Sequence, residues 1–274
     1  MSVFYEMLSY PFLVRAVVVG LLVSLCAALL GVSLVLKRYS MIGDGLSHVG
    51  FGSLAIATAM NLAPLTVSIP VVVLAAFLLL RVSESGKLKG DAAIALISTS
   101  AMAIGVVVIS ATTGMNTDVC NYMFGSILAM SKDDVTLSIA LSIAVLLLYL
   151  LFYHKIFGVT FDETFAQATG TNTGLYNMLI AILTAVTIVL GMRMMGALLI
   201  SSLIIFPSLT SMRLFKTFRS VAICSVAVSI VCFLAGVTVS YLYATPTGAS
   251  IVLTNLVMFL IFWAASALKG RLPA

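Results

Sequence analysis

Runs of about 20 apolar residues are the strongest constraint on this chain. A helix rises about 1.5 Å per residue, so roughly 20 residues cross about 30 Å of hydrocarbon. The strand-like alternation over about ten residues that a transmembrane barrel requires is absent. The sequence therefore predicts an all-α, polytopic membrane protein. We expect nine transmembrane helices, at about 14–36, 41–60, 64–81, 91–111, 134–153, 174–192, 195–212, 219–242 and 247–268.

Composition agrees with a membrane protein. Of the 274 residues, 62% are hydrophobic and 8% are charged, and the mean hydropathy is +1.23. Such a chain cannot present the charged surface that keeps a soluble protein dispersed. No polar stretch is long enough for a separate soluble domain, so we treat residues 1–274 as a single transmembrane domain.

The basic residues predict the orientation, because Lys and Arg are retained on the cytoplasmic side. With nine spans, 11 of the 14 basic residues fall on one side, which places the N-terminus outside and the C-terminus in the cytoplasm. This asymmetry and anionic lipid explain the net charge of +5, and we find no nucleic-acid signal. The majority comprises Lys37, Arg38, Arg81, Lys87, Lys89, Lys155, Arg213, Lys216, Arg219, Lys269 and Arg271, and the minority comprises Arg15, Lys132 and Arg193.

The start of the second span carries polar residues where apolar ones are expected. Asp44 and His48 are four residues apart, so on a helix they share a face and can converge on one small ion. Gly45, Gly50 and Gly52 would let a neighbouring backbone approach that helix. A charged side chain in hydrocarbon costs roughly 2.5 to 3.5 kcal/mol, so the pair predicts a transport pathway.

Other interpretations of the pair remain open. Asp44 could cap the cytoplasmic start of the span and hydrogen-bond His48, with both near the headgroups. In a secondary transporter the two residues would relay protons. An intramembrane enzyme could use them on a bound metal, but no third ligand or nucleophile stands at a helpful spacing. The phosphate-binding Gly-x-x-x-x-Gly-Lys-Ser/Thr loop is missing, so the chain does not bind ATP by that route.

Two connections between spans are long enough to have functions of their own. The outer one, about 112–133, contains Asp118, which either raises the local cation concentration at the mouth or is simply solvated. The cytoplasmic one, about 154–173, contains a predicted short helix from Asp162 to Thr169. Asp162 and Glu163 suit the N-terminus of this helix, and Gly170 suits its end.

Several segments resemble a known family. The Asp-Gly-Leu-Ser-His run at 44–48, after Leu36-Lys-Arg-Tyr-Ser-Met-Ile-Gly, resembles the signature of the membrane subunits of bacterial zinc and manganese ABC importers. The similarity extends over nearly the whole chain, through 118–128, 161–170, 196–200 followed by Pro207, and 246–253. Family members often carry a His and an Asp where this chain has Asn121 and Thr245, so no role is transferred to those two positions.

The resemblance implies a permease similar to type II ABC importers, in the bacterial cell (inner) membrane. Its expected partners are a second copy in a homodimer, two cytoplasmic ABC ATPase subunits and an extracytoplasmic metal-binding protein. The chain would then be no enzyme and would hold no permanent cofactor. Zn²⁺ is the expected transported substrate, with manganese and iron as alternatives.

The resemblance also implies roles for residues. Asp44 and His48, with Asp118 in the outer loop, are the candidate metal ligands, and two copies of the first pair would supply the four nitrogen or oxygen ligands that zinc accepts. The 161–170 segment is the candidate ATPase-coupling helix, with Phe161 and Phe165 filling a groove on the ATPase. An ordinary amphipathic surface helix is the alternative. The coupling candidates are Phe161, Asp162, Glu163, Phe165, Ala166 and Gly170.

Overall fold

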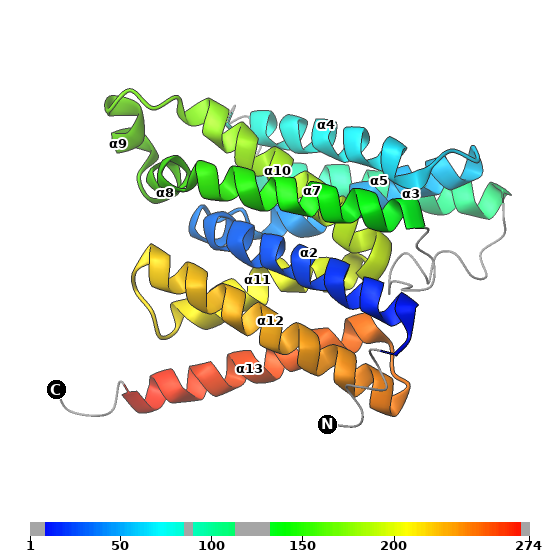
Figure 1. Cartoon of the computed structure of the whole chain (residues 1–274). Helices are drawn as coiled ribbons and strands as arrows, with labels where there is room; N and C mark the ends of the chain where they lie inside the picture. The colour runs from blue at the N-terminus through cyan, green and yellow to red at the C-terminus, as the bar shows by residue number, and fades with distance from the viewer. Residues whose placement is uncertain (1–8, 85–89, 113–131, 270–274) are drawn as a thin grey trace.

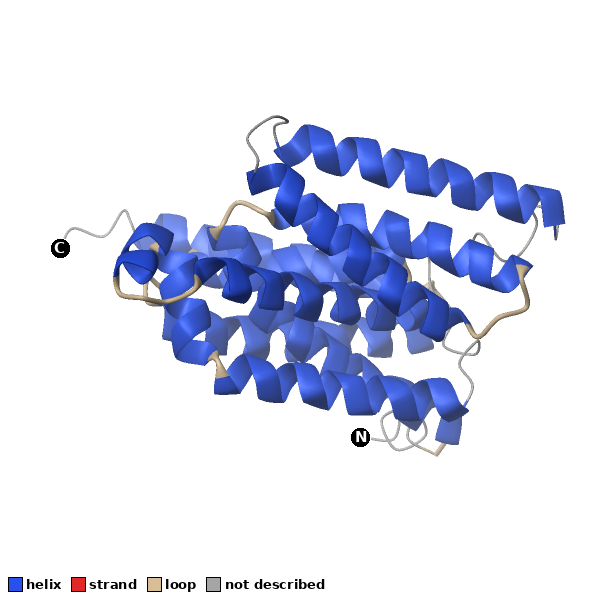
Figure 2. Ribbon diagram, turned by 90° about the horizontal axis from the view of Figure 1, so that it is seen from above, coloured by secondary structure: helices blue, strands red, loops and turns tan. Residues whose placement is uncertain are grey.

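The computed structural model describes residues 9–84, 90–112 and 132–269, and these ranges fold into helices joined by short loops (Figures 1 and 2). The candidate residue Asp118 lies outside the described residues. The helices are α2 (Pro11–Leu36), α3 (Ser40–Ala59), α4 (Pro64–Glu84), α5 (Gly90–Thr112), α7 (Lys132–Leu151), α8 (Tyr153–Phe161), α9 (Glu163–Ala168), α10 (Thr173–Met195), α11 (Ala197–Met212), α12 (Phe218–Tyr243) and α13 (Thr247–Lys269).

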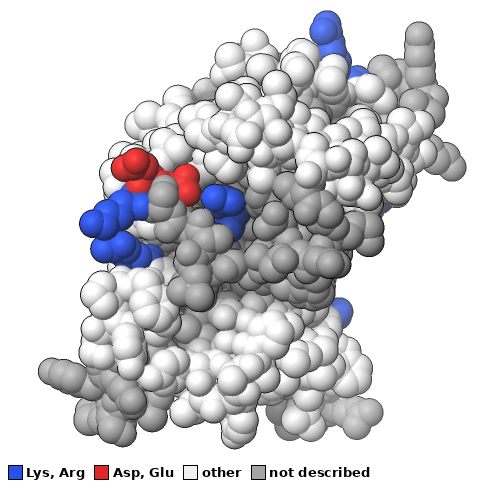
Figure 3. All heavy atoms as spheres, turned by 90° about the vertical axis from the view of Figure 1, so that its right-hand side faces the viewer, with Lys and Arg blue, Asp and Glu red and all other residues white. Residues whose placement is uncertain are grey.

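The long helices run back and forth, so their connections gather at two ends of the bundle (Figure 1). The first end carries the α2–α3 link, α8, α9 and the α11–α12 link. These segments hold five of the 11 basic residues of the described ranges: Lys37, Arg38, Lys155, Arg213 and Lys216. The second end carries the starts of α2 and α7. Figure 3 looks onto the second end and shows a group of acidic atoms with basic atoms beside it. Helix α7 begins at this end with Lys132, Asp133 and Asp134. Which end faces the cytoplasm stays a prediction.

Seven of the described helices are long and apolar enough to cross a membrane: α2, α4, α5, α7, α10, α12 and α13. The other two predicted spans coincide with α3 and α11. Glycines, serines, Asp44 and His48 lower the hydropathy of α3, and α11 is short for a membrane span, at 16 residues. The positions of the predicted spans therefore match helices, whereas the number nine for the crossings stays a prediction.

Helix α3 lies inside the bundle, in contact with α4, α5, α10 and α11. Its approach to α5 is close enough to require glycine. A Cβ atom at Gly52 would lie 2.5 Å from the carbonyl oxygen of Ala101, and one at Gly45 would lie 2.6 Å from the Ile94 side chain. The predicted approach of a neighbouring backbone is confirmed at Gly52, whereas at Gly45 the close neighbour is a side chain.

Helices α10 and α11 reverse direction at a single buried residue. Gly196 joins them with φ 86° and ψ 161°, a backbone conformation that only glycine adopts readily. Its neighbours Met195 and Ala197 are 4% and 8% exposed, so the reversal takes place inside the bundle. The predicted boundary between these two spans, near residue 193, falls about one turn too early.

The cytoplasmic connection predicted for 154–173 is more helical than expected. Helix α8 continues from Tyr153 to Phe161 after a break at Phe152, because Ile156 and Val159 are buried and hold the segment against the bundle. The short helix predicted from Asp162 to Thr169 coincides with α9, whose caps are those two residues. The sequence did not predict the helix in the first part of this connection.

Candidate functional site

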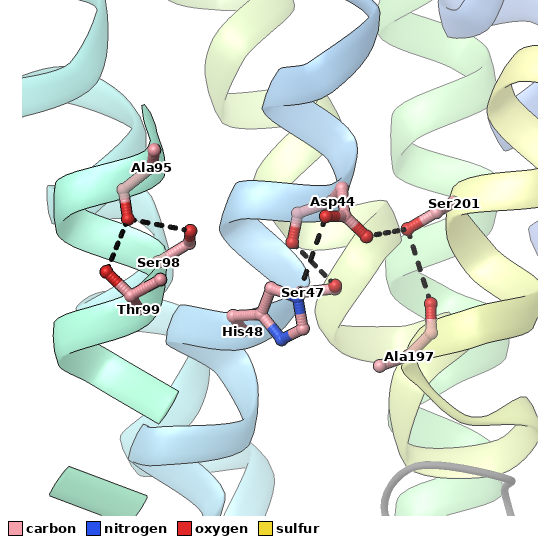
Figure 4. Close-up of polar contacts among 8 residues, drawn as sticks. All are labelled: Asp44, Ser47, His48, Ala95, Ser98, Thr99, Ala197 and Ser201. Atoms are coloured by element: carbon pink, nitrogen blue, oxygen red, sulfur yellow. Dashed lines mark hydrogen bonds and ion pairs between the residues drawn. The ribbon is translucent and has the colours of Figure 1, made fainter. Parts of the chain in front are cut away.

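Asp44 and His48 project from α3 one helical turn apart (Figure 4). Asp44 Oδ2 lies 3.6 Å from His48 Nε2. The Asp44 side chain is 46% exposed and the His48 side chain is 27% exposed, so the pair is partly accessible rather than buried in the core. The proximity expected from the four-residue spacing is present, and the pair lies where a small ion could contact both groups. Their role as metal ligands stays a prediction.

A residue of another helix completes the surroundings of Asp44. Ser201 on α11 donates its hydroxyl to Asp44 Oδ1 at 3.4 Å and also lies 3.3 Å from the carbonyl oxygen of Ala197. One hydroxyl hydrogen serves two acceptors, so each contact is long. Ser201 could not be found from the sequence, because it lies 157 residues from Asp44 and only the fold brings the two together.

The pair borders a cavity of about 480 Å³ between α3 and α5. The Ser98 and Thr99 hydroxyls in its wall donate to the carbonyl of Ala95, so their oxygens keep lone pairs for another partner. A water molecule occupies about 30 Å³ in the liquid, so the cavity has room for a hydrated ion. The lining residues are Met41, Asp44, His48, Ile94, Ala95, Ser98, Thr99 and Met102.

One copy of the described chain offers too few ligands for a closed metal site. Within the described ranges, no group of three or more His, Cys, Asp or Glu residues could hold an ion. Structural zinc sites are almost always closed by four protein ligands. Asp44 and His48 thus form at most half of such a shell, which suits transient occupancy better than permanent binding.

The candidate coupling residues divide into an exposed apolar pair and a supporting group. Phe161 and Phe165 are 72% and 65% exposed at the first end of the bundle. Asp162 caps α9 by accepting a hydrogen bond from the Phe165 N–H at 2.9 Å. Ala166 is buried, and Gly170, with φ 82°, lets the chain turn toward α10. Exposed phenylalanines on two well-anchored short helices are suited to contact another protein.

Glu163 differs from the other coupling candidates because its carboxylate points to the bundle. It lies 3.0 Å from Lys37 Nζ and accepts a hydrogen bond from the amide of Asn177 at 2.8 Å. The sequence gives no sign of a role for Asn177, and from the sequence Lys37 is expected only to help set the orientation. No sequence spacing links Lys37 to Glu163, which is 126 residues away.

Comparison with known proteins identifies the family. The model of the ABC 3 transport family matches residues 9–266. The chain belongs to this family. It is 32% identical to the "Probable metal transport system membrane protein" of Thermotoga maritima, covering 95% of this chain and 92% of that protein. It is 28% identical to the high-affinity zinc uptake system membrane protein ZnuB of Haemophilus influenzae, with 92% and 97% covered.

A solved structure supports the same family. PsaBC from Streptococcus pneumoniae, in complex with Fab, matches with a TM-score of 0.85 and 27% identity over 96% of this chain and 94% of that chain. Further relatives are named for manganese and for iron transport. The names thus agree on a metal and differ on which one.

The protein is therefore the permease subunit of a metal ABC transporter, a multi-pass protein of the bacterial inner membrane. ATP hydrolysis belongs to a separate subunit of such a transporter. The resemblance stated from the sequence is confirmed. The interpretations as a secondary transporter and as an intramembrane enzyme do not fit this family.

Proposed function

We propose that this permease imports a divalent transition metal, zinc first among the candidates, along a path that passes Asp44 and His48. The observation that carries the proposal is the placement of a carboxylate 3.6 Å from an imidazole beside a 480 Å³ cavity. Mixed nitrogen and oxygen ligands suit Zn²⁺ and Mn²⁺, whereas thiolates would favour copper. The three described cysteines, Cys26, Cys224 and Cys232, do not line this cavity.

The proposal includes a homodimer. Two copies of the pair would supply two carboxylates and two imidazoles, which matches the four ligands of a tetrahedral zinc site. Manganese prefers more oxygen ligands, for which the Ser98 and Thr99 hydroxyls are available in each copy. An ion held by few protein ligands and water also leaves readily, as transport requires. Asp118 is the proposed first contact for the ion in the outer loop.

The other proposed contacts follow the family architecture. An extracytoplasmic metal-binding protein delivers the ion, and two ATPase subunits dock on α8 and α9. The exposed rings of Phe161 and Phe165 support this docking site, because apolar side chains exposed at the end of the bundle are stabilised when a partner's groove buries them. Asp162 and Gly170 support it indirectly by holding the ends of α9.

Replacement of His48 tests the proposed path. In proteoliposomes containing the permease, its ATPase and its binding protein, His48→Ala should abolish zinc uptake and leave the complex assembled. His154→Ala is the matched control, since His154 is the second of the two histidines and lies exposed on α8, away from the cavity. Normal uptake by the assembled His48→Ala complex would reject the path. Uptake of manganese and iron by the unaltered complex identifies the preferred metal.

A further inference from the structure

A second polar cluster lies at the first end of the bundle, outside the candidate metal path. It consists of Lys37 at the C-terminus of α2, Glu163 at the start of α9 and Asn177 on α10, and we name it the Lys37 cluster. Lys37 Nζ lies 3.0 Å from Glu163 Oε2, and Asn177 Nδ2 donates to Glu163 Oε1 at 2.8 Å. Lys37 also donates to Asn177 Oδ1, which closes a ring of three contacts.

Burial makes this cluster more than a surface ion pair. The side chain of Lys37 is 8% exposed and Asn177 is 6% exposed, whereas the Glu163 side chain is 47% exposed. A buried ammonium group is tolerated only with partners, so Lys37 depends on Glu163 and Asn177. Both carboxylate oxygens of Glu163 are engaged, which fixes the first residue of α9 against α2 and α10.

The Lys37 cluster lies next to the helix that carries the metal pair. Only Lys37, Arg38 and Tyr39 separate α2 from α3. The link is held by its own backbone: the Arg38 N–H donates to the Val35 carbonyl at 3.1 Å, and the Tyr39 N–H donates to the Leu34 carbonyl at 2.8 Å. Because the link is short and held by these hydrogen bonds, a displacement of Lys37 should be passed on to the first residues of α3. Asp44 follows one turn after the start of α3 at Ser40.

We propose that the Lys37 cluster transmits movement of α9 to α3, so that Glu163 and Lys37 are positioning residues that couple the ATPase to the metal pair. The inference rests on the proposed function, in which the ATPase docks on α9. Phe161 and Phe165 bind the ATPase and move with it. The Glu163 carboxylate, which contacts Lys37, transmits this movement to the α2–α3 link. This role differs from docking, because both carboxylate oxygens of Glu163 contact residues of the bundle.

The test measures metal imported per ATP hydrolysed in the reconstituted complex. Lys37→Gln and Glu163→Gln remove one charge each at nearly constant size. Each should still bind the ATPase and hydrolyse ATP, while metal imported per ATP falls about tenfold, within the usual range of coupling between sites. A purely structural role would lower the amount of complex and leave that ratio unchanged.

A charge exchange makes the test specific. The double variant Lys37→Glu with Glu163→Lys restores an opposite-charge pair, and the amide of Asn177 can turn over to serve it because it carries both a donor and an acceptor. The exchanged charges are unfavourable for the dipoles of α2 and α9, so recovery should be incomplete, to within about threefold of the original ratio. If a single variant does not assemble, recovery in the double variant supports the proposal, and no recovery overturns it.

Lys155→Gln is the matched control. Lys155 lies at the same end and contacts Thr171 at 3.4 Å, but it joins α8 to the segment after α9 and not to α2. Its variant should keep the original ratio. Assembled Lys37→Gln and Glu163→Gln complexes with a normal ratio would overturn the proposal. An unaltered complex that imports no metal would instead reject the proposed function itself.

Discussion

Asp44 uses its two carboxylate oxygens in different directions, one toward His48 on its own helix and one toward Ser201 on α11. A side chain held from two helices keeps its orientation only while those helices keep their relative position. Metal ligands are commonly oriented by such outer hydrogen bonds. The position of α11 should therefore influence how strongly the Asp44–His48 pair binds an ion.

Ser201→Ala tests this influence. The hydroxyl makes only a long hydrogen bond of 3.4 Å, so its loss should lower the apparent affinity for zinc by about three- to tenfold, which is below the roughly 10- to 100-fold usual for such outer contacts. The maximal rate should change little, because both candidate ligands remain. Uptake measured against zinc concentration checks the expectation. Ser202→Ala is the control, since Ser202 donates to Leu199 within α11; equal affinities for both variants would contradict the role of Ser201.

Sequence spacing could predict the Asp44–His48 pair because both residues lie within one helical turn, where local geometry decides. It could not predict Ser201, Lys37 or Asn177 as partners. Their contacts span 157, 126 and 14 residues and depend on how α2, α9, α10 and α11 pack. The glycines of α3 could be predicted in part: their number indicated a close contact with another helix, but not that this helix is α5.

Helix α3 depends on its glycines for its distance from α5. A Cβ atom at Gly52 would meet the backbone oxygen of Ala101 at 2.5 Å, and backbone cannot rotate away as a flexible side chain can. The two helices must separate, at a cost of about 1 to 3 kcal/mol for overpacking. Gly52→Ala should therefore lower the melting temperature of the detergent-purified permease.

Gly158→Ala is the matched control for that experiment. It makes the same chemical change in α8, where a Cβ atom would meet nothing within 4 Å. Alanine is favoured over glycine in a helix by up to about 1 kcal/mol, so the melting temperature should stay the same or rise. Equal losses of stability in the two variants would show that the α3–α5 contact is not the cause.

Phe165 offers a test of α9 as a docking element. Its ring is 65% exposed, so Phe165→Asp should leave the stability of the permease unchanged. A charge placed in an apolar groove of the ATPase should weaken copurification of that subunit at least about tenfold, as loss of an aromatic anchor does in other interfaces. Gln167→Ala, also exposed on α9, should keep normal binding. ATPase association and metal-stimulated hydrolysis that persist in Phe165→Asp would disprove docking through this ring.

Hydropathy predicted the positions of the long helices, but it did not predict the short helix α8 or the depth of the turn at Gly196. The predicted spans fall on helices because apolar runs of membrane length leave few alternatives. Helix α8 was missed because it is only nine residues long and its helicity depends on packing of Ile156 and Val159. The buried reversal at Gly196 was also missed, since a glycine between two apolar runs does not show how deep in the bundle the chain turns.

The whole molecule has an uneven distribution of charge between its two ends. Lys37, Arg38, Lys155 and the α11–α12 link place basic residues at the first end. At the second end, Arg193 NH2 lies 3.7 Å from Asp134 Oδ2, and both side chains are largely buried, at 14% and 17% exposed. The charge of Arg193 is thus offset within the protein, which strengthens the contrast between the ends. Retention of Lys and Arg in the cytoplasm then predicts that the first end is cytoplasmic.

Single cysteines test this orientation. In a variant whose four cysteines are replaced by alanine, Asn61→Cys places a thiol in the exposed link between α3 and α4, and Gln167→Cys places one on exposed α9. A membrane-impermeant maleimide added to right-side-out vesicles should label the first variant directly and the second only after the membrane is opened. The cysteine-free parent sets the background. If sealed vesicles label only Gln167→Cys, the predicted orientation is wrong and the first end lies outside. If they label both variants, the two links lie on the same side of the membrane, so an even number of crossings separates them.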